Sequence, residues 1–287
     1  MGQKTTRRPV LRLREHGISK RPDTLAVEEP LMVRIGGATL TMTMRTPGDD
    51  FDLVAGWLVS EGAVRDVSQL EGMRLCPDED NTVEVMLAPG VEPPVARAFT
   101  TTSACGVCGA DSIADVRTAM PWPVDEDPLV LEPDLVTELP DRLRDGQRVF
   151  DRTGGLHAAG LFDADGSPVL IREDVGRHNA VDKVVGAALR AGMLPLAGHI
   201  LQLSGRASFE LVHKAVMAGV PVLSAISAPS SLAVDLAAEC GLTLMGFVRG
   251  SSVNLYTRAD RVISTPAPPT EAATPRPHLS APHRQAG

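Results

Sequence analysis

Aromatic residues are scarce in this chain, since Phe, Trp and Tyr together make up 3% of its 287 residues. The core must therefore be built from aliphatic side chains, and a hydrophobic content of 43% suffices for one large domain or two smaller ones. Cysteine is also rare: four residues exclude a secreted disulfide framework and favour a reducing cytoplasm. No apolar run reaches the roughly 18 residues that a membrane-spanning helix needs.

Positive charge and the common phosphate-binding motifs are lacking as well. A net charge of −8 argues against nucleic-acid or anionic-membrane binding, and neither GxxxxGK[ST] nor GxGxxG occurs. The first 22 residues are basic, and no apolar stretch follows Arg7-Arg8. We therefore expect a flexible basic arm over 1–24 rather than an export signal. The Pro- and Ala-rich tail, 264–287, is expected to be disordered.

The most informative stretch that is present is Cys105-Gly106-Val107-Cys108-Gly109. These two thiols lie on a glycine-rich turn that leads into a helical pattern of apolar residues, starting at Ile113. A cysteine at a helix start faces unpaired N–H groups and the positive end of the dipole, which favour thiolate over thiol. The pattern therefore predicts a nucleophilic sulfur.

Three other readings of the CxxC remain open. They are half of a structural zinc site, a short disulfide, and two inert buried thiols. A zinc site needs a second pair of ligands, and the other cysteines, Cys76 and Cys240, stand alone in the sequence. We predict no permanently bound metal.

Alternation and helical spacing divide the chain into two parts. Residues 25–120 are predicted to form a smaller α+β portion, with a hairpin over 31–44, a helix over 51–59, a strand over 83–87 and the CxxC helix. A Pro-rich connector is expected over 121–140. In 141–263, strands over 169–171, 200–203, 220–225 and 242–248 alternate with helices. This rhythm indicates an α/β fold with right-handed βαβ units in a mixed sheet.

Three polar loops follow strands of this second part. They are Ser204-Gly205-Arg206, Ser227-Ala228-Pro229-Ser230 and Arg249-Gly250-Ser251-Ser252. Because parallel strands end at the same edge of a sheet, we expect these loops to lie together. Backbone N–H groups at helix starts, with Arg206 and Arg249, would form a phosphate or pyrophosphate site. The alternative is that they are ordinary polar loops whose arginines pair with surface carboxylates.

Two further segments carry candidate residues. Arg172-Glu173-Asp174-Val175-Gly176-Arg177-His178-Asn179 follows a strand, and so many polar side chains must bind a ligand or pair with one another. The helix that continues it is expected to expose Asp182 and Lys183. His157, Arg177 and His178 are candidates for proton transfer or support of the site, while a hydrogen-bonded core histidine is the alternative for His157.

Taken together, these segments resemble the formate dehydrogenase accessory sulfurtransferase family (FdhD). The matching blocks are residues 103–109, 153–159, 172–183, 204–206, 227–230 and 247–257, in the family's order. The resemblance implies a cytidine-deaminase-like core and a homodimer in the cytoplasm. Deamination itself is not expected, because zinc deaminases need an H-x-E motif that this sequence lacks.

The resemblance also implies a function. A member of this family would accept persulfide sulfur from an IscS-type cysteine desulfurase, with Cys105 as the first choice of carrier and Cys108 as its partner. It would pass the sulfur to the bis-molybdopterin guanine dinucleotide molybdenum cofactor for formate dehydrogenase. The segment Phe247-Val248-Arg249-Gly250-Ser251-Ser252 would contact the guanine dinucleotide. A CxxC disulfide oxidoreductase and a nucleotide-binding assembly chaperone remain alternatives.

Overall fold

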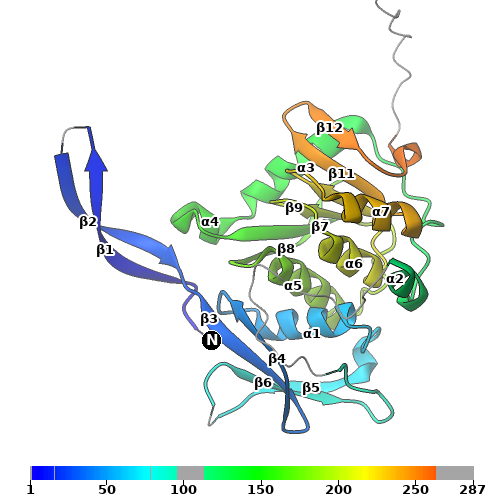
Figure 1. Ribbon diagram of the computed structural model, residues 1–287, viewed down its shortest axis with the longest axis horizontal. Coiled ribbons are helices and arrows are strands. Elements are labelled where there is room, and N and C mark those ends of the chain that lie inside the picture. Colours follow the sequence, from blue (N-terminus) through cyan, green and yellow to red (C-terminus); the bar gives the residue numbers. More distant parts are fainter. Residues whose placement is uncertain (1, 16, 78, 96–112, 263–287) are drawn as a thin grey trace, which may run out of the picture.

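The computed structural model describes residues 2–15, 17–77, 79–95 and 113–262. These residues form a six-stranded sheet, a four-stranded sheet and a two-stranded hairpin, with helices packed between and around the larger sheets (Figure 1). The chain is therefore a mixed α/β protein. Among the described helices, none combines the length and the apolar character needed to cross a membrane.

The six-stranded sheet has the order β12-β11-β10-β9-β7-β8. Strands β9, β10 and β11 are parallel, whereas β7 runs antiparallel to both β8 and β9, and β12 runs antiparallel to β11. The predicted parallel βαβ units are confirmed. The strands are β7 (His157–Phe162), β8 (Pro168–Asp174), β9 (Ile200–Leu203), β10 (Val222–Ala225), β11 (Thr243–Arg249) and β12 (Ser252–Leu255).

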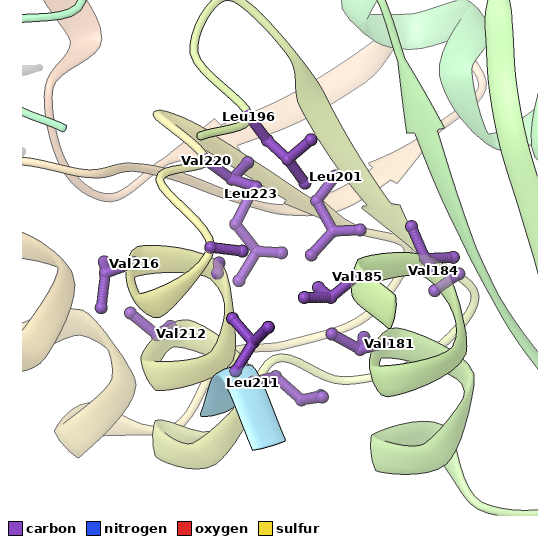
Figure 2. Close-up of a cluster of buried hydrophobic side chains, with 14 of the residues drawn as sticks. Val181, Val184, Val185, Leu196, Leu201, Leu211, Val212, Val216, Val220 and Leu223 are labelled. Atoms are coloured by element: carbon purple, nitrogen blue, oxygen red, sulfur yellow. The ribbon is translucent and has the colours of Figure 1, made fainter. Parts of the chain in front are cut away.

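Helices cover both faces of this sheet. α5 (Arg177–Arg190), α6 (Phe209–Met217) and α7 (Ser231–Cys240) follow β8, β9 and β10 and pack on one face. Figure 2 shows aliphatic side chains of α5, α6 and the adjoining strands interdigitating, among them Val185, Leu201, Leu211 and Leu223, all fully buried. α3 (Pro133–Asp145) lies on the opposite face over a second cluster that includes Val222, Met245 and Val248. The core is therefore built mainly from aliphatic side chains, as the scarcity of aromatic residues predicted.

The smaller sheet has the order β4-β3-β6-β5 and is joined to the main body by α1 (Asp50–Ser60). The hairpin predicted over 31–44 is confirmed, because β3 and β4 pair antiparallel. Gly36 and Gly37 form its two-residue turn, and both have the positive φ that such a turn between twisted strands requires. α1 crosses α5 so closely that a Cβ on Gly56 would lie 1.8 Å from the Asp182 carbonyl oxygen. The four strands are β3 (Glu29–Ile35), β4 (Ala38–Arg45), β5 (Leu70–Leu75) and β6 (Thr82–Leu87).

Two regions differ from the sequence-based expectation. Most of segment 1–24, expected to be a flexible basic arm, forms a long hairpin of β1 (Thr5–Arg14) and β2 (Gly17–Ala26). Within the Pro-rich connector, residues 133–140 belong to α3, which starts at Pro133, where the missing N–H costs nothing. A short helix, α4 (Arg148–Thr153), then leads to Gly154 and β7. The tail 264–287 lies outside the described residues.

Candidate functional site

The three predicted loops meet at one edge of the six-stranded sheet. β8, β9, β10 and β11 all end there, and β7 begins there with His157, which lies opposite Asp174. The backbone links the loops in a row: Ser227 N donates to Gly205 O at 3.3 Å, and Phe247 N donates to Ser227 O at 3.2 Å. Parallel connectivity therefore places the loops as the sequence predicted.

The loops approach one another too closely for larger residues. A Cβ on Gly205 would lie 3.3 Å from His157 Nδ1, and one on Gly246 would lie 2.9 Å from Pro229 Cδ. Phe247 itself has a φ of 53°, a left-handed conformation that is costly for a non-glycine residue and is typical of ligand-binding sites. The Arg249 guanidinium stacks over the Phe247 ring.

Some predicted site residues use their side chains for structure. Ser204 Oγ accepts from Ala158 N at 2.8 Å, and Ser230 Oγ caps α7 by accepting from Ala233 N at 3.3 Å. The Val248 side chain is fully buried in the core under α3. These three residues can reach a ligand chiefly through backbone groups, while Arg206, Arg249, Gly250, Ser251 and Ser252 are exposed.

A cavity of about 550 Å³ opens at this edge, on the side of α3 and α4. Its size is in the range of pockets that hold small ligands. The sequence reading missed the contribution of α3 and α4, because Arg144, Gln147 and Phe150 precede the matching loops and carry no motif. The lining residues are Arg144, Gln147, Phe150, Gly154, Gly155, Leu156, His157, Val175, Ser204 and Ile226.

Positive charge gathers around His157. Burial is the first cause that lowers the pKa of His157 below its ordinary value, and Arg177 and Arg206 lower it further against an opposing effect of Asp174. Within the described ranges, Arg177, Arg206 and Arg249 form no ion pair with a carboxylate, and the buried Nε of Arg177 has no hydrogen-bond partner. An anionic ligand would satisfy these groups.

The 172–183 segment is mostly a network of mutual pairs. Asp174 and Lys183 form a fully buried ion pair with Oδ2 and Nζ 2.7 Å apart. Asp174 also accepts from Gly176 N at 2.8 Å, and Glu173 accepts from the backbone N–H groups of the second and third residues of α4. This arrangement fixes the turn that presents Arg177.

The exposure predicted for Asp182 and Lys183 is wrong. Both are buried because α1 and α6 pack on either side of α5: Asp182 accepts from Lys214 Nζ and from Ser60 Oγ. Burial raises the pKa of Asp182, although its contact with Lys214 acts in the opposite direction.

His178 faces α6 rather than the cavity lining. Its Nε2 lies 3.3 Å from Ser208 Oγ and 3.4 Å from Glu210 Oε2, so it ties the start of α5 to the start of α6. The structure therefore gives His178 a positioning contact, and its role in proton transfer stays a prediction.

The model of the FdhD/NarQ family matches residues 26–263, most of the chain. The chain belongs to the FdhD/NarQ family.

Members of the FdhD/NarQ family are similar over nearly their whole length. A protein named Sulfur carrier protein FdhD from Streptomyces coelicolor is 58% identical over 273 residues, which cover 91% of this chain and 97% of that protein. One from Mycobacterium tuberculosis is 51% identical over 275 residues, 91% of this chain and 100% of the relative. A crystal structure described as a formate dehydrogenase accessory protein from Desulfotalea psychrophila superposes with a TM-score of 0.71 at 22% identity, covering 91% and 100%.

The predicted catalytic pair, Cys105 and Cys108, lies outside the described residues. The described cysteines do not offer a substitute nucleophile of the expected kind. Cys240 is buried, and burial raises the pKa of its thiol to about 11. Cys76 is half-buried near the smaller sheet, far in the sequence from any of the site loops. In the described ranges, no group of three or more His, Cys, Asp or Glu side chains could hold a metal ion.

Proposed function

We propose that this FdhD-family protein is a sulfur carrier that serves formate dehydrogenase in the cytoplasm. It takes persulfide sulfur from an IscS-type cysteine desulfurase and passes it to the bis-molybdopterin guanine dinucleotide molybdenum cofactor. The observation that carries the proposal is near-full-length similarity to proteins named as sulfur carriers. The unpaired arginines beside a cavity support it independently, because the acceptor is a large anion.

Loading requires one thiolate displacement. The Cys105 thiolate attacks the outer sulfur of the desulfurase persulfide, a new S–S bond forms on Cys105, and the desulfurase cysteine leaves as a thiolate. That the helix after the CxxC favours the thiolate form stays a prediction, because α2 (Ile113–Ala119) begins five residues after Cys108 and both cysteines lie outside the described residues.

Release uses the second thiol. The Cys108 thiolate attacks the inner sulfur of the Cys105 persulfide, which leaves a Cys105–Cys108 disulfide and expels the outer sulfur as hydrosulfide at the molybdenum. The two cysteines supply the two electrons that reduce sulfane sulfur to sulfide. A cellular dithiol reductant then regenerates both thiols by exchange.

The acceptor cofactor is held at the sheet edge. Arg177, Arg206 and the N–H groups at the helix starts would hold its pyrophosphates, and the loop 247–252 would contact its guanine end. The strained backbone at Phe247 and the close approach of Gly246 to Pro229 keep this loop against its neighbours. A disulfide oxidoreductase would need the CxxC but neither the cavity nor the unpaired arginines near it, and a chaperone would need the cavity but not the thiols.

Guanosine diphosphate is expected to bind wild-type protein and to bind Arg206→Ala and Arg249→Ala about 10- to 100-fold more weakly, since each charge-assisted hydrogen bond contributes about 1.5–3 kcal/mol. Arg74→Ala, which removes an exposed arginine of the smaller sheet, is the matched control with unchanged affinity. Calorimetric titration measures both. Equal affinity of all four proteins would remove these loops from the binding site.

The affinity for guanosine diphosphate in the same titration should depend on pH in a defined direction. The pKa of His157 is lowered in the free protein, and a bound anion would raise it. Binding therefore takes up a proton and tightens as the pH falls below the ordinary histidine value of about 6.5. His157→Gln subtracts this component and leaves only the titration of the phosphate itself.

A further inference from the structure

The cavity at the edge of the six-stranded sheet contains a buried side-chain amide, that of Gln147. This residue is 4% exposed and directly precedes α4, but its side chain does not cap the helix. Within the described part of the chain, the amide has no hydrogen-bond partner, and it is not sealed from solvent, so it faces the cavity that Gln147 lines. A ligand with a matching donor and acceptor would recover the free energy that an unpaired buried amide costs.

The walls of the cavity suit a planar ring. The Arg144 guanidinium carbon lies 4.7 Å from the centre of the Phe150 ring, and both residues line the cavity. Guanidinium and aromatic groups both stack on flat ring systems. Apolar surface on the other walls comes from Leu156, Val175 and Ile226.

The cavity itself has little free positive charge. Arg144 is the one arginine among its described lining residues, and it already pairs with Asp151. The lowered pKa of His157 keeps that ring neutral at neutral pH. Arg177 and Arg206, by contrast, do not line the cavity. An uncharged ring therefore fits the cavity, while the anionic part of the same ligand fits the arginines beside it.

The sheet beneath the cavity is polar as well. Gln202 of β9 and Ser224 of β10 are register partners on the sheet face that α3 covers. They lie two residues before Ser204 and Ile226, which line the cavity, and strand side chains two residues apart share a face. Gln202 Oε1 and Ser224 Oγ are buried and have no hydrogen-bond partner among the described residues. This polar surface disfavours a wholly apolar occupant such as an acyl chain.

We propose that the cavity is a subsite for a neutral planar heterocycle with a lactam edge, in which a ring N–H lies next to a ring carbonyl. The oxygen of the Gln147 amide accepts from this N–H, and its nitrogen donates to the carbonyl. Arg144 and Phe150 cover the face of the ring.

The identity of the heterocycle rests on the function proposed above. The acceptor cofactor contains two rings with a lactam edge, the pterin and the guanine. The loop 247–252, which is assigned to guanine, does not line the cavity. The pterin therefore occupies the cavity, and the pyrophosphate connects it to the guanine across the arginines.

Two fluorescent ligands, pterin and lumazine, test the role of Gln147 by titration. Both have the lactam edge, but lumazine has a carbonyl where pterin has its 2-amino group. The wild-type protein should bind both, and Gln147→Leu should weaken both by about 10-fold or more, because the edge loses two hydrogen bonds. Gln147→Glu should keep pterin, whose N–H and amino group both donate to a carboxylate, and should lose lumazine, whose second carbonyl repels it. A change of packing alone would not produce this selectivity.

Matched variants control for the loss of an amide and of a ring. Gln3→Leu removes an exposed amide far from α4 in the sequence and should bind pterin as the wild type does. Phe150→Leu should weaken pterin and lumazine alike by about 5-fold. Phe51→Leu is its control, because the Phe51 ring also lies under an arginine, Arg190, but does not line this cavity. Thermal unfolding of each variant checks that it is folded.

The proposal is overturned if the wild-type protein binds neither ring, or if Gln147→Leu binds both as tightly as the wild type. It is also overturned if saturating guanosine diphosphate displaces pterin from the wild-type protein, since guanine would then occupy the cavity. Sulfur loading reports separately on the proposed function. Pterin binding through Gln147 without sulfur loading would support the subsite and contradict the carrier role, and the reverse result would contradict the subsite alone.

Discussion

Formate dehydrogenase activity should be lost in cells whose single copy of this protein carries Cys105→Ala. In the proposed cycle Cys105 is the residue that accepts the persulfide sulfur and Cys108 acts only after it, so the loss should be complete rather than partial. The formate dehydrogenase polypeptide should still accumulate, because the step affected is delivery of sulfur to its cofactor. Activity measured in extracts, normalised to the amount of enzyme, checks this.

Cysteines elsewhere in the chain provide the matched controls for this experiment. Cys240→Ala removes a buried thiol whose raised pKa keeps it protonated at neutral pH, and Cys76→Ser removes a half-buried one. Both variants should retain activity once their expression is matched. Retained activity in Cys105→Ala, with the protein folded and present at the wild-type level, would contradict the carrier role.

The second large effect concerns stability. Lys183→Met leaves the Asp174 carboxylate fully buried without its cation, which should lower the free energy of unfolding by about 3–5 kcal/mol. Asp174 keeps its hydrogen bonds from Gly176 N and Asn179 Nδ2, but neither donor carries a full positive charge. Urea denaturation followed by circular dichroism measures the change.

Two further variants make the stability test specific. Asp174→Asn/Lys183→Met removes both charges and should recover a large part of the loss, because the uncompensated charge causes most of it. Arg142→Met breaks an exposed pair with Glu138 and should cost less than about 1 kcal/mol. If Lys183→Met cost no more than Arg142→Met, the buried pair would not organise the turn that presents Arg177.

The sequence predicted which edge of the sheet carries the site, but not all of the residues that line the cavity there. Short apolar strands such as 200–203, each followed by a polar turn, have few alternatives to a βαβ unit, and parallel connectivity then forces the loops to one edge. The cavity wall from Arg144, Gln147 and Phe150 could not be inferred, because α3 and α4 reach the edge only by packing across the other face of the sheet.

The burial of charged side chains on α5 could likewise not be inferred from the sequence. Lys183 and Asp182 read as an exposed helical pair because their partners, Asp174, Lys214 and Ser60, come from three other elements. The hairpin of β1 and β2 was missed for the opposite reason. Its leucines alternate with arginines as strand residues do, but no face of it is buried within the chain, so the alternation at Leu11 and Leu13 was outweighed by charge.

The carrier role is tested most directly by intact-protein mass spectrometry after incubation with a cysteine desulfurase and cysteine. The wild-type protein and Cys108→Ala should each gain a sulfur atom that a thiol reductant removes, and peptide mapping should place it on Cys105. Cys105→Ala should gain none. A wild-type protein that gains no sulfur at either CxxC cysteine would contradict the proposed function, whatever its affinity for guanine nucleotides.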